Sequence, residues 1–194
     1  MKRETLWIVV LAVVAALFAG TAARAQEGQF EYVGSKSCKK CHLKEFKSWE
    51  ATKMAQTFET LKPGAAAEAK TGAGLDPEKD YTTDEACVHC HVTGYGQPGG
   101  FVDIETTPEL VGVGCEMCHG PGGTYIQDGY MTLENKEYKK ADLVAVGLVD
   151  KVGEAQCVNC HNSESPFVDE GFVFDFEAQK SEGLHENFEL KYSH

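Results

Sequence analysis

Apolar residues recur at helical spacing between Lys39 and Leu61. They form a stripe along one side of a helix that turns by about 100° per residue. The members of this stripe are Leu43, Phe46, Met54, Phe58 and Leu61. The Lys62-Pro63-Gly64 sequence that follows would end the helix. A methionine in the middle of such a stripe is most often a core residue.

The rest of the chain carries weaker patterns. Thr82 and Glu85 have the spacing of a capping box, which predicts a short helix at this point. Residues 134–149 and 174–190 are also predicted to be helical, the first with an interruption near Gly147. A glycine-rich stretch and weak alternation over residues 94–105 predict at most a small β-hairpin. We therefore expect a mainly α fold.

The N-terminus has the pattern of a secretory signal peptide. Lys2 and Arg3 precede an apolar run from Leu6 to Gly20, and Ala23-Arg24-Ala25 is a suitable cleavage site. The run is shorter than the roughly 20 residues that a membrane-spanning helix needs. We predict that residues 1–25 are removed on export to the periplasm and that residues 26–194 form a single domain without a membrane span. An uncleaved anchor is the alternative.

All eight cysteines belong to four C-x-x-C-H units, the pattern of covalent c-type haem attachment. Two thiols three positions apart can bond the two vinyl groups at one edge of a porphyrin, and the adjoining histidine can then ligate the iron. The units are Cys38-Lys-Lys-Cys41-His42, Cys87-Val-His-Cys90-His91, Cys115-Glu-Met-Cys118-His119 and Cys157-Val-Asn-Cys160-His161.

Paired cysteines also occur in disulfides, zinc sites and redox dithiols. None of these requires a histidine directly after the second cysteine of every unit. We therefore predict four haem c groups, each with an iron whose proximal ligand is His42, His91, His119 or His161. With so few residues per haem, the porphyrins would form much of the apolar core, and short helices and loops would wrap around them.

Histidines are too few to ligate every iron on its second side. Outside the proximal positions, the chain has only His89, His185 and His194. His89 lies between the two cysteines of its own unit, in a loop too tight to reach the face of a haem. Two histidines cannot complete four bis-histidine haems within one subunit. At least two irons must take methionine, another ligand, a group from a neighbouring chain, or none.

Methionines are also few. Met1 would leave with the signal peptide and Met117 lies inside an attachment unit, so Met54 and Met131 are the candidate ligands. A methionine ligand raises the haem potential relative to histidine. Mixed ligation would therefore spread the four potentials.

The formal net charge of the chain is −12. Such acidity argues against nucleic acid and anionic lipid as partners. It favours redox proteins with basic docking patches, although acidity also keeps an exported protein soluble.

Several segments resemble the tetrahaem cytochrome c-554 family of nitrifying bacteria, and together they cover nearly the whole mature chain. The segments are Gly34-Ser-Lys-Ser-Cys38 and its continuation to Pro63, Leu75-Asp-Pro-Glu-Lys-Asp-Tyr81, Gly94-Tyr-Gly-Gln-Pro-Gly-Gly100, Gly112-Val-Gly-Cys115 to Gly122, and Phe172-Val-Phe-Asp175 before His185. The resemblance implies a mostly helical multihaem cytochrome c fold, with haems stacked in close pairs that pass electrons between periplasmic partners.

The resemblance also implies two features of haem ligation. His185 matches the distal ligand of the haem at His119. The haem at His91 would be five-coordinate, with an open face.

At two positions this sequence departs from the family. Where the family has a distal histidine for the haem at His161, this chain has Met54, which becomes the candidate ligand. The distal histidine for the haem at His42 is also absent, and Met131 is the candidate there. An open iron or one capped by tyrosine is the alternative at His42.

Electron transfer is therefore the predicted function, and catalysis is not the main expectation. One alternative is a haem enzyme that acts on a small nitrogen or oxygen species at an open iron, with His91 the favoured place. Another is a subunit of an extracellular cytochrome filament, in which His194 could complete a neighbour's haem. A monomer is favoured.

Overall fold

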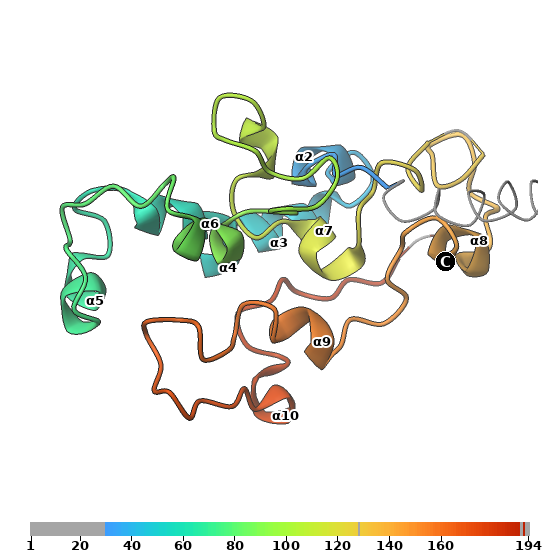
Figure 1. Cartoon of the computed structure of the whole chain (residues 1–194). Helices are drawn as coiled ribbons and strands as arrows, with labels where there is room; N and C mark the ends of the chain where they lie inside the picture. Colours follow the sequence, from blue (N-terminus) through green and yellow to red (C-terminus); the bar gives the residue numbers. More distant parts are fainter. Residues whose placement is uncertain (1–29, 128, 191, 193–194) are drawn as a thin grey trace, which may run out of the picture.

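The structure is a computed structural model, which describes residues 30–127, 129–190 and 192. The predicted signal peptide and His194 lie outside the described residues. Within them the protein is mainly helical, with short helices joined by turns and loops (Figure 1). The only strand-like pairing among the described residues is an isolated antiparallel bridge between Val92 and Val111. No helix in this part of the chain is both long and apolar enough to cross a membrane.

The helices of the first half are α2 (Ser35–Cys38), α3 (Leu43–Glu50), α4 (Lys53–Gln56), η1 (Thr57–Leu61), α5 (Ala67–Gly72), α6 (Glu85–His91) and η2 (Pro108–Leu110), where η marks a 3₁₀ helix. Those of the second half are α7 (Cys115–His119), α8 (Lys140–Val144), α9 (Glu154–Cys157) and α10 (Phe176–Gln179). In Figure 1, α5 lies at one end of the molecule and α8 at the other, while α9 and α10 form a separate group below α4, α3 and α7.

The single helix predicted from Lys39 to Leu61 is divided into α3, α4 and η1. The backbone NH of Thr52 bonds the carbonyl of Trp49 at 2.8 Å and so ends α3. Thr52 itself has an extended backbone, and its hydroxyl accepts the NH of Ala55 as the cap of α4. The hydrophobic stripe was informative nonetheless, because Phe46, Phe58 and Leu61 are buried.

The other predicted elements are shorter than expected. The helix predicted over residues 134–149 is confined to α8, and that over residues 174–190 is confined to α10. Gly183 has φ +69°, a left-handed conformation that a continuing helix does not allow. The predicted hairpin over residues 94–105 contains no strand. The helix of the second C-x-x-C-H unit is present, but its cap is Asp84, which accepts the NH of Ala86, and not Thr82.

The main hydrophobic core is small and lies in the first half of the chain. It gathers side chains from η1, α6, η2 and the loops between them: Phe58, Leu61, Tyr81, Val88, Val92, Phe101 and Leu110. The ring of Phe58 lies 6.0 Å from that of Phe101. This core fixes α6, and with it one attachment unit, against η1.

A buried carboxylate joins α7 to the start of the described chain. Glu116 is only 2% exposed. Its oxygens accept backbone NH groups from Val33 at 3.0 Å, Gly34 at 2.8 Å and Gly122 at 2.7 Å. Burial raises the pKa of this carboxyl, and the three NH groups act in the opposite direction. Ser35 adds a second link, since its hydroxyl accepts the NH of Cys115 at 3.1 Å.

Replacing Glu116 with alanine should destabilise the haem-loaded protein by about 3 kcal/mol or more, because three backbone donors would lose their acceptor. Urea unfolding followed by circular dichroism measures this loss. Glu68→Ala, at an exposed position of α5, is the control and should change stability by less than about 0.5 kcal/mol. Equal stabilities of the two variants would show that the Glu116 contacts contribute little.

Candidate haem-attachment sites

Each C-x-x-C-H unit is folded as about one turn of helix. The backbone NH of His42 bonds the carbonyl of Cys38 at 3.0 Å, and that of His161 bonds the carbonyl of Cys157 at 2.9 Å. The second unit forms the end of α6 and the third is α7 itself. One helical turn puts residues three apart on the same face. Both thiols of a unit can therefore reach one edge of a porphyrin.

The four units meet in two pairs through their thiols. Those of Cys38 and Cys115 lie close enough to interact, and this interaction raises the pKa of Cys38 and lowers that of Cys115 to about 6. Those of Cys90 and Cys160 do the same, so that the pKa of Cys160 is raised and that of Cys90 is lowered to about 7. The first unit therefore lies against the third, and the second against the fourth.

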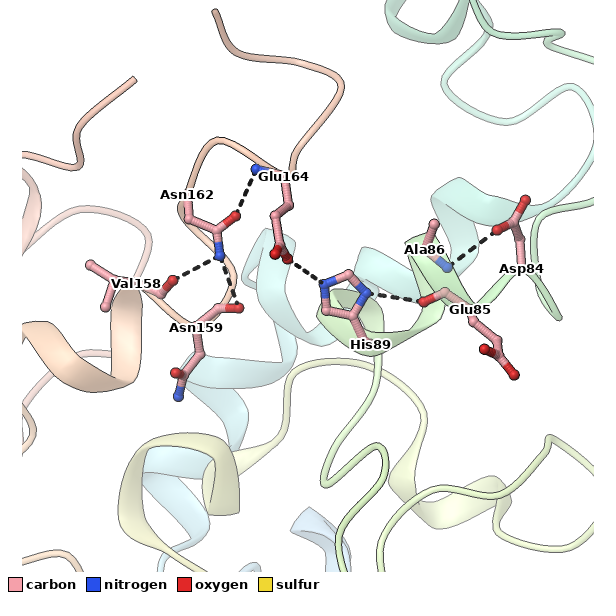
Figure 2. A network of polar contacts seen from close by, with 8 residues as sticks. All are labelled: Asp84, Glu85, Ala86, His89, Val158, Asn159, Asn162 and Glu164. Atoms are coloured by element: carbon pink, nitrogen blue, oxygen red, sulfur yellow. Dashed lines mark hydrogen bonds and ion pairs between the residues drawn. The ribbon is translucent and has the colours of Figure 1, made fainter. Parts of the chain in front are cut away.

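A polar contact reinforces the second of these pairs (Figure 2). His89 of α6 points toward Glu164, which follows the fourth unit, with its Nε2 atom 3.9 Å from the Glu164 carboxylate. Its Nδ1 atom bonds the carbonyl of Glu85 at 3.0 Å. Asn162 orders the same loop by accepting the NH of Glu164. His89 thus lies on a helix and not in a tight loop, and it contacts the loop after the fourth unit.

A cavity of about 480 Å³ lies between the first and third units. This volume is within the range of small-molecule and cofactor sites. The predicted site residues that line it are Cys38, Cys41, His42, Cys115, His119, Met131 and His185. The structure thus brings Met131 to the same cavity as His42, and His185 to the same cavity as His119.

The rings of His119 and His185 are spaced as two axial ligands would be. A metal–imidazole bond is about 2.0 Å long and the ring centre lies roughly 1.15 Å behind the nitrogen, so imidazoles on opposite sides of one metal have centres about 6.3 Å apart. The observed separation of the ring centres is 6.3 Å. The separation of the two ring centres is therefore compatible with both residues binding one metal ion.

The second nitrogen of His185 is held by the backbone. Its Nδ1 atom lies 2.8 Å from the carbonyl oxygen of Glu186. A carbonyl can only accept, so Nδ1 carries the proton and Nε2 keeps the lone pair that binds a metal. The NH of Glu186 in turn bonds the hydroxyl of Ser48 in α3 at 2.8 Å. His185 is therefore positioned by a loop anchored to α3, although the predicted helix is missing.

His91 is prepared for metal binding in the same way. Its Nδ1 atom lies 2.7 Å from both the carbonyl oxygen and the hydroxyl of Thr57 in η1. Donation to the carbonyl leaves Nε2 as the free ligand atom. Burial lowers the pKa of His91, which favours the neutral imidazole that binds metals.

The remaining predicted residues lie in different surroundings. Met54 is half-buried in α4, where its carbonyl accepts the NH of Val113 at 3.0 Å. The ring of His161 lies beside that of Phe174, with 4.9 Å between the ring centres. The NH of Met131 bonds the carbonyl of Tyr125.

Sequence reasoning missed three residues that organise these sites: Thr57, Glu116 and Glu164. Each acts on a partner distant in the sequence, and no local pattern marks it. The one feature of the sequence that could have drawn attention to any of them is that Glu116 is a carboxylate inside an attachment unit. The sequence does not show that Glu116 is buried.

None of the eight cysteines is in a disulfide, so all of them are available for thioether bonds. The helical fold and the attachment turns define a multihaem c-type cytochrome, in which haem is bound covalently through its porphyrin. The family described as "Cytochrome c554 and c-prime" matches residues 37–120. Cytochrome c-554 of Nitrosomonas europaea is 37% identical over an alignment of 201 positions, which includes 92% of this chain and 85% of the relative.

The chain belongs to the cytochrome c-554 family. The solved structure of reduced cytochrome c554 from Nitrosomonas europaea superposes with a TM-score of 0.71 at 36% identity. The match covers 84% of this chain and 88% of the other. The predicted mainly α cytochrome fold is confirmed, and membership of this family supports a role in electron transfer with redox partners.

In the haem-loaded protein, His185→Ala should convert one haem from low spin to high spin, because the nitrogen opposite His119 is lost. Low-temperature EPR of the oxidised protein should show one additional high-spin iron per chain. Glu182→Ala, at an exposed position close to His185 in the sequence, is the control and should leave the number of high-spin irons unchanged. An unaltered spectrum of the alanine variant would mean that His185 binds no iron.

Proposed function

We propose that this chain is a periplasmic electron carrier with four haem c groups, one at each C-x-x-C-H unit, held in a single domain over residues 26–194 after removal of residues 1–25. The observation that carries the proposal is the arrangement of the units in two pairs: the first and third line one cavity through Cys38, His42, Cys115 and His119, and the second lies beside the fourth. Each iron, once bound, can cycle between the ferric and ferrous states by one electron.

The thiols are the points at which the porphyrin edges are attached. Thiols in contact therefore favour two haem pairs, one at His42 and His119 and the other at His91 and His161. His89 of the second unit and Glu164 after the fourth unit lie 3.9 Å apart, in keeping with this second pair. Electron transfer weakens steeply with distance, so close edges are what a multihaem carrier needs.

Ligation on the distal side differs from haem to haem in this proposal. His185 completes the haem at His119, in keeping with the 6.3 Å between their rings. Met131, which lines the cavity with His42, serves the haem there. Met54 serves the haem at His161, and the haem at His91 keeps an open face. Such mixed ligation spreads the potentials, because methionine raises a haem potential relative to histidine.

The surface near the fourth unit suits a basic partner. Residues 154–177 contain six carboxylates and no lysine or arginine. All six carboxylate side chains are exposed: Glu154, Glu164, Asp169, Glu170, Asp175 and Glu177. A redox protein with a basic docking patch would be attracted to this face, where the haem at His161 would receive or donate the electron.

Met54→His should lower the potential of the haem at His161, because histidine replaces a methionine ligand. Met54→Leu should instead remove the ligand and add a high-spin signal. Redox titration followed by EPR separates the two results. Unchanged spectra and potentials in both variants would exclude Met54 as an iron ligand.

Transfer of electrons from the reduced protein to a basic acceptor, mitochondrial cytochrome c, should slow as ionic strength rises, because the surface attraction is screened. Asp169→Asn/Glu170→Gln should lower the rate at low ionic strength by roughly threefold. Glu68→Gln/Glu105→Gln is a control with the same change of charge at exposed positions elsewhere. A rate that does not depend on ionic strength would contradict acidic docking at the fourth unit.

A further inference from the structure

The positive charge of this acidic protein is concentrated around its first attachment unit. Residues 36–53 contain six lysines and two glutamates, whereas the whole chain has a net charge of −12. The six lysines are Lys36, Lys39, Lys40, Lys44, Lys47 and Lys53, here called the lysine patch, and all of them are exposed. They lie on α2, α3, α4 and the turn between α2 and α3.

The charge of these lysines is not matched by an ion pair, as is also true of Lys136, Lys139 and Lys151 among the described residues. Among the described residues, no member of the lysine patch forms an ion pair, whereas Lys62, Lys79, Lys140 and Lys180 each pair with a carboxylate at 2.6–2.9 Å. Two members are held over aromatic rings, Lys39 at 4.6 Å from the centre of Phe46 and Lys44 at 5.7 Å from that of Phe188. Their positive charge therefore remains available to a group outside the protein.

The lysine patch includes the sequence neighbours of a cysteine that would attach a haem. Cys41 is exposed, while the other seven cysteines are partly buried. Lys39 and Lys40 directly precede it in the sequence. Leu43, which begins α3, is 47% exposed among these lysines. An apolar centre with a charged rim is the composition of a protein–protein interface.

We propose that the lysine patch docks an acidic one-electron redox protein, which exchanges electrons with the haem at His42. This inference rests on the proposed electron-carrier function and adds a second partner, opposite in charge to the one expected near the fourth unit. In each encounter one electron leaves the reduced centre of the partner, and one ferric iron of this protein becomes ferrous. The two docking faces then lie at α2–α3 and α9–α10, which Figure 1 shows as separate groups of helices.

The test is stopped-flow reduction of the haem-loaded protein by flavodoxin hydroquinone, an acidic one-electron donor, at low ionic strength. Lys36→Gln/Lys44→Gln/Lys47→Gln removes three charges of the lysine patch without changing a cysteine or a proposed ligand. Lys62→Gln/Lys79→Gln/Lys180→Gln removes the same charge elsewhere and is the matched control. Haem potentials are measured in both variants, so that a change in driving force is not mistaken for a change in docking.

The expected result is a rate about tenfold lower in the lysine-patch variant and changed less than twofold in the control. The difference should vanish near 1 M salt, where the Debye length is about 3 Å. Equal rates in the two variants at low ionic strength would overturn the docking site and leave the proposed carrier function standing. No reduction of any form of the protein would overturn both.

Anionic phospholipid is the other surface that lysines could bind. Binding to phosphatidylglycerol vesicles is therefore measured for the same two variants. Loss of vesicle binding in the lysine-patch variant, together with an unchanged flavodoxin rate, would overturn the proposal in favour of a membrane surface. Loss of the flavodoxin rate without an effect on vesicles supports it.

Discussion

Contact between attachment turns that lie far apart in the sequence is the constraint on which this fold depends. The first turn meets the third through Cys38 and Cys115, and the second meets the fourth through Cys90 and Cys160. The protein's main apolar cluster spans only residues 58–110. Among the described residues beyond 111, the buried hydrophobic side chains are only Tyr125, Leu143 and Phe174. The second half of the chain is therefore held by turn-to-turn contacts and by the haem that they would carry, more than by a core of its own.

The attachment turns could be predicted because covalent chemistry fixes their spacing. Two thioethers to one porphyrin edge require cysteines three positions apart, and the proximal histidine must follow at once. The pairing of His185 with His119 came from the family resemblance, and the structure places their rings at a distance that suits one metal. The prediction that a helix carries His185 was wrong. What positions this residue is the hydrogen bond from Glu186 to Ser48, a contact between distant segments that periodicity cannot reveal.

Long-range contacts explain most of what the sequence could not provide. Glu116 is separated by more than 80 residues from the backbone groups of Val33 and Gly34 that it binds. Thr57 lies 34 residues from His91. In the sequence, Glu116 and Thr57 resemble ordinary surface positions of a helix. The predicted helix boundaries were wrong for a related reason. The hydroxyl of Thr52 and the left-handed conformation of Gly183 interrupt the helices, although the hydrophobic pattern continues past both residues.

Net charge proved a coarse guide to partners. The acidic total describes the chain as a whole, yet lysines dominate residues 36–53 and carboxylates dominate residues 154–177. A carrier must receive electrons from one protein and deliver them to another. Opposite charges at separate attachment turns would keep these two partners from competing for one surface, because each would be repelled by the face that attracts the other.

Thr57 and Met54 belong to one continuous run, in which η1 follows α4 without a break. The carbonyl of Thr57 accepts the ring NH of His91. Met54, three positions earlier, is the candidate ligand of a different haem. An insertion, deletion or rotation within this short run would disturb both environments together. Natural variation in this segment should therefore be confined to substitutions that preserve its length and helical conformation. The exposed side chains around it are free to vary.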